Sequence, residues 1–458
     1  MKLHLRAMLA ASFVIFSMLA CKGQDPEPYV PGKSEPEEPA EPEDPEPQEE
    51  GQYYFDGTYY HDLPSNDWEK EVMARTNMMK DLKWTPVGNM PKSADTPGVY
   101  YTAGVTMTGL PYSNTSGTMG YLGRDVSFYT FLSAVNNPKS KMYTVDYRTS
   151  SSYNSKSSFY GAACSNMVAY AWGLPATYLT NNVYFDEIPE VFIKKESQSI
   201  QDLNLFDIYC WSAESGGHMA MVYDIARDKD GTVKEITIFE SIHPMSACTT
   251  YTPSKLTAKM KSFKFPAYFY RYNREEYYGK VELPSFGEQS AGELSYDFPT
   301  DLCVNLGDKV SIRYGTPVVI NILSKDYTDI ELYLGDELHE KRALDSDNDV
   351  TYTALPVGLY KARLVNGSKA SGYTYFEIGD LSCGISSKGN RLTVSCSKNT
   401  SVPQYVLMNG DIRRMLYKDS DNLWHYEGST VSSATSCTVY FAGKYGSYKG
   451  SSKTIIKQ

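Results

Sequence analysis

From about residue 297 to residue 458, the chain consists of short stretches in which apolar and polar residues alternate. Turns rich in Gly, Asp and Asn separate these stretches, and the alternation predicts strands with one buried face. The stretches are Lys309–Tyr314, Pro317–Ile322, Ile330–Leu334, Tyr360–Val365, Tyr373–Ile378, Arg391–Cys396, Gln404–Met408, Trp424–Tyr426 and Ser436–Phe441. We therefore expect two successive β-sandwiches, residues 297–380 and 381–458.

The first residues have the pattern of an export signal. Lys2 and Arg6 precede an apolar stretch, Met8 to Leu19, which is too short to span a membrane at about 20 residues. The small residue directly before Cys21 resembles a bacterial lipoprotein cleavage site, which implies that residues 1–21 are a lipoprotein signal with a lipidated Cys21. Cleavage by the ordinary secretory route is the alternative.

The next segment, residues 22–52, is acidic and rich in proline. Between residues 25 and 50, eleven acidic residues and one lysine give a local charge of −10, within a net charge of −11 for the whole chain. Such a segment buries too little apolar surface to fold, so we expect a disordered tether. The rest of the chain is nearly neutral, which argues against nucleic acid as a partner.

A cysteine stands where a helix is expected to begin. Cys164 precedes apolar residues at helical spacing, including Met167, Val168 and Ala171, and Gly173 ends the pattern. The free amides and positive dipole end of such a helix favour a thiolate, which is the nucleophilic form of the side chain. A single cysteine beside apolar residues is more often part of a core.

A histidine and a carboxylate follow on a predicted hairpin. His218 opens an alternating stretch to Ile225, Asp230-Gly231 forms the turn, and a second strand runs from Val233 to Phe239 before Glu240. Glu240 could accept a hydrogen bond from the far imidazole nitrogen and orient the ring. His243 is the alternative third residue. The pattern predicts Cys164 as nucleophile and His218 as base.

These residues resemble the NlpC-type and CHAP-type papain-like hydrolases. The resemblance covers roughly residues 95 to 245 and includes Gly109-Leu-Pro-Tyr112 ahead of the cysteine and Leu205-Phe-Asp207-Ile ahead of the histidine strand. It implies an α+β papain-like domain over residues 53–296, followed by all-β, Ig-like β-sandwich domains. Tyr112, Ser113 and Ser165 are then candidate substrate or oxyanion residues.

The sequence also departs from that family. The usual Asp-Cys-Ser-Gly is here Ala163-Cys-Ser-Asn166, and Phe206 replaces the glycine before Asp207. More than forty residues separate Tyr112 from Cys164, which implies an insertion. Within it, residues 125–135 have helical periodicity.

The resemblance implies a peptidase or amidase that cleaves peptide or cell-wall-derived amide bonds through a thioester. A catalytically inactive binding or adhesion lipoprotein and an acyl or amide transferase are the alternatives. The acidic tail after Cys21 resembles that of Bacteroidetes-type surface lipoproteins, so we expect a lipid anchor in the outer membrane, at its periplasmic face or at the cell surface. Any ligand of the C-terminal domains is unknown from the sequence.

The remaining cysteines indicate disulfides more than metal binding. Cys396 and Cys437 are spaced so that they could join two sheets, with Cys383 as the competing partner. The spacings typical of zinc sites and phosphate-binding loops are missing from the sequence, so we expect no metal and no cofactor.

Overall fold

The computed structural model describes residues 53–91, 98–112, 128–143, 161–173, 192–213, 216–242, 244–272, 298–305, 310–345, 349–398, 400–410, 412–420 and 422–458. Cys21, Ser113, His243 and the tether lie outside these residues. All of the described residues belong to one compact unit within residues 50–458. None of the described helices is both long and apolar enough to cross a membrane.

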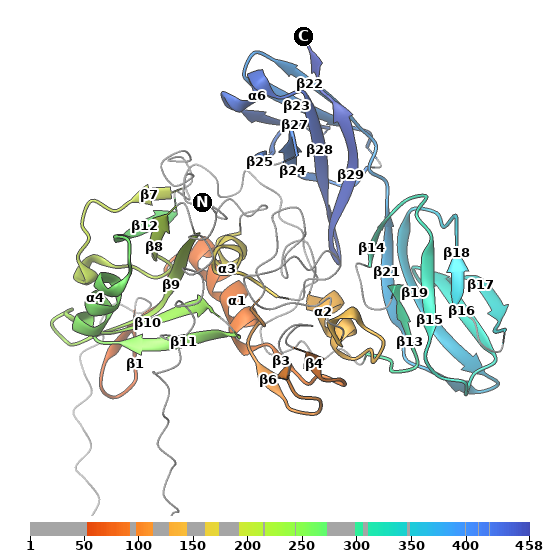
Figure 1. The fold of residues 1–458 in the computed structure, drawn as a ribbon, viewed down its shortest axis with the longest axis horizontal. Helices are drawn as coiled ribbons and strands as arrows, with labels where there is room; N and C mark the ends of the chain where they lie inside the picture. The colour runs from red at the N-terminus through yellow and green to blue at the C-terminus, as the bar shows by residue number, and fades with distance from the viewer. Residues whose placement is uncertain are drawn as a thin grey trace, which may run out of the picture. The chain divides into compact units, whose positions relative to one another are not determined.

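An antiparallel sheet is the centre of the first part of the described chain (Figure 1). Its strands are β1 (Tyr53–Phe55), β2 (Tyr60–Asp62), β7 (Phe192–Lys194), β8 (Ile208–Ala213), β9 (Gly216–Arg227), β10 (Val233–Ser241), β11 (Ser246–Tyr251) and β12 (Ala267–Tyr272). The order is β1-β2-β9-β8-β12-β7, and β10 pairs with β9 and β11. The predicted hairpin is thus confirmed as β9 and β10.

Helices and short ribbons accompany this sheet. They are α1 (Asp67–Asp81), α2 (Phe128–Val135), α3 (Cys164–Ala171), α4 (Pro253–Ser262), the 3-10 turns η1 (Lys141–Tyr143) and η3 (Ile200–Asp202), and the ribbons β3 (Lys83–Trp84) with β6 (Met107–Thr108) and β4 (Met90–Pro91) with β5 (Val99–Tyr101). Helix α1 begins after Asn66, whose side chain accepts the Glu69 amide as an N-cap.

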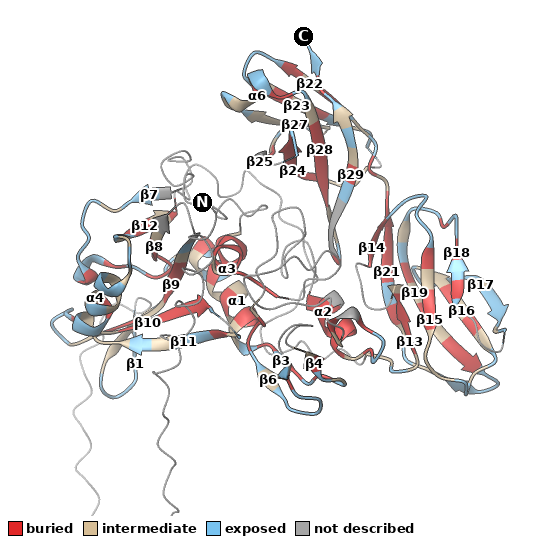
Figure 2. Cartoon of the chain, in the orientation of Figure 1, coloured by how far each residue is buried: buried red, intermediate tan, exposed pale blue. Residues whose placement is uncertain are grey.

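Helix α3 lies inside the protein. Every residue from Ser165 to Ala171 is buried, as Figure 2 shows, and the helix packs against α1 and β9. Arg75 of α1 donates from Nε to the Ala171 carbonyl oxygen at 2.9 Å, which satisfies a free carbonyl at the negative end of α3. Burial on all sides thus fixes the helix that starts at Cys164.

The predicted fold class, an α+β papain-like (NlpC-type) domain ahead of the β-sandwiches, is wrong. The described residues are mostly strands, and their helices are few and short. Long-range pairs such as β2 with β9 and β7 with β12 add short strands to the sheet of the first part. Their partners are far apart in sequence, so local periodicity underestimated the sheet. The protein is mainly β.

The predicted all-β region is confirmed. The first set of strands is β13 (Leu302–Val304), β14 (Ser311–Arg313), β15 (Val318–Ile322), β16 (Asp329–Leu334), β17 (Glu337–Ala343), β18 (Val350–Tyr352), β19 (Gly358–Asn366), β20 (Lys369–Ala370) and β21 (Thr374–Gly379). They form the sheets β13-β15-β18 and β14-β21-β19-β16-β17, with β20 beside β19. Residues of both sheets share one core, as in a sandwich.

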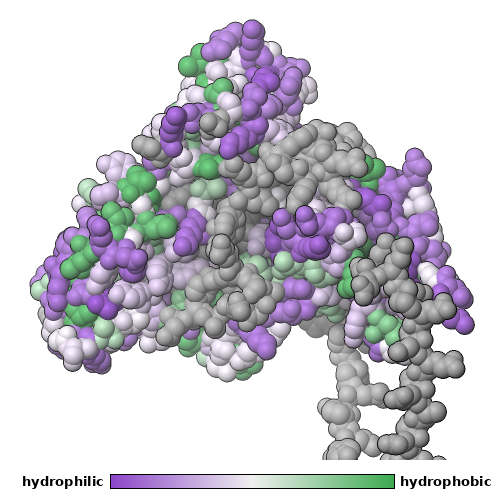
Figure 3. Space-filling model, turned by 180° about the vertical axis from the view of Figure 1, so that it is seen from behind, coloured by the Kyte–Doolittle hydropathy of each residue, from purple (hydrophilic) through white to green (hydrophobic). Residues whose placement is uncertain are grey.

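The second set forms another two-sheet arrangement around a separate core. Its elements are β22 (Cys383–Lys388), β23 (Arg391–Cys396), β24 (Pro403–Met408), β25 (Ile412–Met415), β26 (Tyr417–Ser420), β27 (Leu423–Glu427), α6 (Thr430–Ser433), β28 (Ser436–Gly443), β29 (Gly446–Thr454) and β30 (Ile456–Lys457). The sheets are β26-β27-β23-β22-β30 and β25-β24-β28-β29. On the face seen in Figure 3, hydrophobic residues are scattered in patches among hydrophilic ones.

Candidate active site

The structure brings Cys164, His218 and Glu240 together. Cys164 is the first residue of α3 and is half-buried, His218 lies near the start of β9, and Glu240 lies near the end of β10. Oε2 of Glu240 lies 2.9 Å from Nε2 of His218. The thiol of Cys164 lies close enough to the same imidazole that each group shifts the pKa of the other. Since Nε2 is engaged by Glu240, Nδ1 is the ring nitrogen left for the thiol.

Strand register explains why the carboxylate reaches the histidine. Tyr209 of β8 lies opposite Ala220 of β9, and Phe239 of β10 lies opposite Met221. Glu240 therefore stands beside Ala220, diagonal to His218 on the same face of the sheet. The small Ala220 side chain leaves room above it, and the Tyr209 hydroxyl donates to Glu240 across it at 3.3 Å.

Glu240 is only 4% exposed, and its two oxygens have different partners. Oε2 faces His218 and Tyr209, whereas Oε1 accepts a hydrogen bond from Nζ of Lys259 in α4 at 2.7 Å. Lys259 also contacts the Tyr251 hydroxyl at 2.9 Å. A buried carboxylate needs such partners to stay ionised.

These contacts shift the pKa values of the three groups. Burial would raise the pKa of Cys164, but the hydrogen bond and charge of His218, with the amides of Met219 and Ser165, lower it. Burial would lower the pKa of His218, yet bonds to Cys164 and Glu240 raise it to about 9. Burial would raise the pKa of Glu240, but bonds to His218 and Lys259 lower it to about 2. The geometry favours a thiolate beside an imidazolium at neutral pH.

The segment before Cys164 is held by strand ends. The hydroxyl of Ser241 donates to the Ala162 carbonyl at 2.7 Å, and Ala162 donates from its amide to Pro111 at 3.0 Å. Tyr112 forms a parallel bridge with Ala162, and its amide donates to Pro244 at 2.8 Å. The backbone of Tyr112 is thus adjacent to the segment that carries the nucleophile candidate.

Gly109, at the start of the Gly-Leu-Pro-Tyr element, is required by this packing. Its φ is +98°, and a Cβ there would lie 3.0 Å from both the carbonyl oxygen and the hydroxyl of Ser246. Only glycine accepts this backbone and this contact without a shift.

Two departures from the family pattern have visible consequences. Phe206 adopts a φ of 67°, the left-handed region that favours the missing glycine, and its ring is buried edge-on to Trp68. Asn166 is fully buried, and its amide has no hydrogen-bond partner among the described residues.

Of the other candidates, Ser165 is buried and points its amide at the Cys164 thiol. Lys259, Tyr209 and Ser241 were not predicted from the sequence. None of the three had a sequence signal that could have identified it. Among the described residues, no cluster of three or more His, Cys, Asp or Glu side chains could hold a metal ion.

Comparison with known proteins gives no family. No protein-family model matches the chain, and no curated protein matches it. Among solved structures, murine CEACAM1b is 9% identical over 34% of this chain and 98% of its own, with a TM-score of 0.19. Fibronectin(III)-like modules of Clostridium thermocellum CbhA are 14% identical over 34% and 94%, with a TM-score of 0.18.

A third structure, Bacteroides ovatus SGBP-B from a mixed-linkage glucan utilization locus in complex with a mixed-linkage heptasaccharide, is 16% identical over 32% of this chain and 42% of its own, with a TM-score of 0.14. At TM-scores this low, the likenesses carry no argument about the function of this chain.

Proposed function

We propose that the chain is a cysteine peptidase or amidase in which Cys164 is the nucleophile, His218 the base and Glu240 the orienting carboxylate. The observation that carries the proposal is the position of one imidazole between two groups. Oε2 of Glu240 lies 2.9 Å from Nε2, and the Cys164 thiol, at the start of a buried helix, lies close enough to the same ring to raise its pKa. A purely structural histidine needs neither an ionised thiol nor a buried carboxylate.

The reaction follows from these positions. The Cys164 thiolate attacks an amide carbonyl carbon, and the oxyanion accepts hydrogen bonds from amides at the start of α3, where the first turn has no helical acceptors. The His218 imidazolium gives its proton to the leaving amine, which leaves a thioester on Cys164. His218 then takes a proton from water, and the hydroxide attacks the thioester carbon and displaces the Cys164 thiolate, which releases the acid and restores the thiolate–imidazolium pair.

We propose peptide or cell-wall-derived amide bonds, such as those of peptidoglycan, as the substrate class. The support is the resemblance of the residues around Cys164, His218 and Tyr112 to NlpC-type and CHAP-type hydrolases. Export as a lipoprotein anchored through Cys21, in the outer membrane at its periplasmic face or at the cell surface, would place the enzyme near that material. These proposals of substrate and location rest on sequence patterns.

Thiol alkylation tests the nucleophile directly. Iodoacetamide labelling of the purified protein, quantified for each cysteine by peptide mass spectrometry, gives separate rates for Cys164 and for the exposed Cys248 as an internal control. Near pH 6.5 we expect Cys164 to react about tenfold faster in the wild type than in His218→Ala, because more of it is thiolate when the imidazole is present. The rate for Cys248 should be unchanged in that variant.

Peptidoglycan fragments then test the reaction, with Cys164→Ala as the inactive control. Release of a new amine and carboxylate supports hydrolysis, whereas capture of the acyl group by added hydroxylamine in preference to water supports a transferase. A Cys164 that labels equally fast with and without His218 would reject the proposal in favour of a binding or adhesion lipoprotein.

A further inference from the structure

Two cysteines face each other at the open end of a hairpin in the last sandwich. Strands β22 and β23 are joined by a two-residue turn at Gly389, whose φ is +58°. Their register runs from Lys388 opposite Arg391 to Cys383 opposite Cys396. Both cysteines are thiols in the structure and half-buried.

The pairing has the geometry that a cross-strand disulfide needs. The Cys396 amide donates to the Asn422 carbonyl oxygen at 3.1 Å, on the side away from Cys383. Cys396 and Cys383 therefore do not exchange backbone hydrogen bonds. The two cysteines therefore form a non-hydrogen-bonded pair, in which Cα atoms are about 4.5 Å apart and side chains are close. Disulfides span Cα separations of about 4.4–6.8 Å.

Lys453 makes the two thiols unequal. It comes from β29 in the other sheet, and its ammonium donates to the Cys383 carbonyl oxygen. The hydrogen bond from Cys396, together with the charge of Lys453, lowers the pKa of Cys383 to about 7 against the effect of burial. The pKa of Cys396 is raised, chiefly by its bond to Cys383. Cys383 is thus the thiol prepared to attack.

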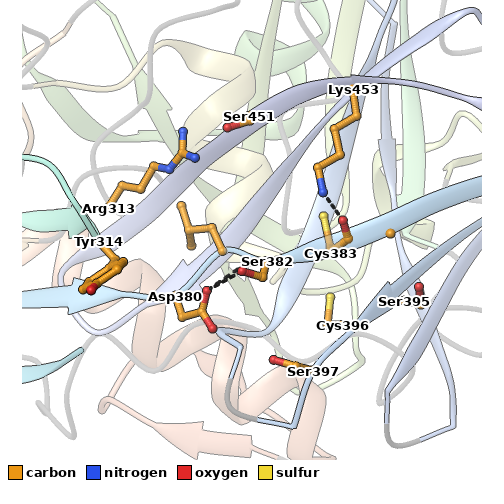
Figure 4. A pocket seen from close by; sticks show the side chains of 12 residues that line it. Arg313, Tyr314, Asp380, Ser382, Cys383, Ser395, Cys396, Ser397, Ser451 and Lys453 are labelled. Atoms are coloured by element: carbon orange, nitrogen blue, oxygen red, sulfur yellow. Dashed lines mark hydrogen bonds between the residues drawn. The ribbon is translucent and has the colours of Figure 1, made fainter. Parts of the chain in front are cut away.

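A reagent can reach the pair. Both cysteines and Lys453 line a pocket of about 560 Å³, shown in Figure 4, which also includes Asp380 and Arg313. Cys437, the rival partner from the sequence, is 1% exposed in the core and does not line this pocket.

We propose that Cys383 and Cys396 are a redox pair that closes to an intramolecular disulfide by exchange with a small disulfide. The Cys383 thiolate attacks one sulfur of the oxidant, forms a mixed disulfide and releases one thiolate, which takes up a proton. Cys396 loses its proton and attacks the Cys383 sulfur, which releases the second thiol. Two protein thiols are oxidised, and the disulfide is reduced to two thiols. The site is independent of the Cys164 chemistry.

The test uses the reduced full chain treated with glutathione disulfide at pH 7.5. We expect loss of two hydrogen atoms from the protein mass and a tryptic cross-link between the peptides that end at Lys388 and Lys398. Cys396→Ser should stop at a stable glutathione adduct on Cys383, and Cys437→Ser should still form the cross-link. Lys453→Met should slow adduct formation about three- to tenfold at pH 7, whereas the exposed Lys449→Met should not.

Two outcomes would overturn the proposal. One is a cross-link between Cys396 and Cys437. The other is an absence of any cross-link in chains whose circular dichroism shows a folded β protein. An adduct that forms equally fast in Lys453→Met would leave the disulfide but reject the assignment of Cys383 as the activated thiol.

Discussion

Nζ of Lys259 lies 2.7 Å from Oε1 of Glu240, so the carboxylate that orients His218 is itself paired with a cation. The buried carboxylate thus contacts two cations, the Lys259 ammonium through Oε1 and the His218 imidazolium through Oε2. Glu240 should therefore raise the pKa of His218 and Lys259 should lower it, so substitution of each residue has a distinct measurable effect.

Lys259→Met should move the alkaline limb of activity to higher pH. Without the neighbouring cation, the whole charge of Glu240 acts on the imidazolium, and His218 holds its proton longer. We expect an upward shift on the order of one pH unit in the profile of kcat/KM. The exposed Lys255→Met, four residues earlier on the same helix, is the matched control. A downward shift would contradict this reading.

Glu240→Gln should move the same limb the other way. In the wild type, the rate should fall as pH rises through about 9, because His218 loses the proton that it gives to the leaving amine. A neutral amide cannot stabilise the imidazolium by charge. The pKa that sets the alkaline limb should therefore be lower by about one unit or more. The acid limb, which reports the lowered pKa of Cys164, should remain below that of an ordinary thiol. An unchanged alkaline limb would show that Glu240 does not tune His218.

Glu240 should also contribute to acid unfolding. Its pKa is lowered from 4.5 to about 2, so its stabilising effect is complete above pH 4.5 and is lost as pH falls toward and through 2. Between pH 7 and pH 3 the wild type should lose about 2 kcal/mol more than Glu240→Gln in the free energy of unfolding. Urea unfolding at both pH values measures this, with the exposed Glu337→Gln as control. Equal losses in all three proteins would refute the prediction.

At position 206, a glycine variant should be more stable than an alanine variant, which is the reverse of the usual order. The residue has a φ of 67°, which costs a non-glycine residue about 1–2 kcal/mol, while its buried ring packs against Trp68. Phe206→Ala should lose about 3–5 kcal/mol, because it removes the ring and keeps the strain. Phe206→Gly should be less destabilised than Phe206→Ala by about 1 kcal/mol. Thermal or urea unfolding decides the order. A less stable glycine variant would mean that the backbone is not strained.

Local patterns in the sequence were sufficient for several elements. The start of α3 at Cys164 and the hairpin of β9 and β10 are confirmed. Helical spacing, caps and strict alternation are properties of neighbouring residues, so the sequence shows them directly. The same alternation determined the all-β character of the C-terminal region.

Other features depend on pairing between distant segments. The amount of sheet in the first part was underestimated, because strands such as β2 and β7 are only three residues long and acquire their partners through long-range pairing. Strand β17 was not predicted, because it is charged and exposed along most of its length and so lacks the alternation of apolar and polar residues.

At the candidate site, the residue types were visible in the sequence, but their arrangement was decided by the tertiary structure. The choice of Lys259 as the cation on Glu240, and of Cys383 rather than Cys437 opposite Cys396, follows from strand register and helix placement. Hydrogen bonds and charges act over a few ångströms in space, whereas these partners are 19 and 13 residues apart along the chain. The sequence determined which groups could react, and the packing of sheets and helices decided which of them meet.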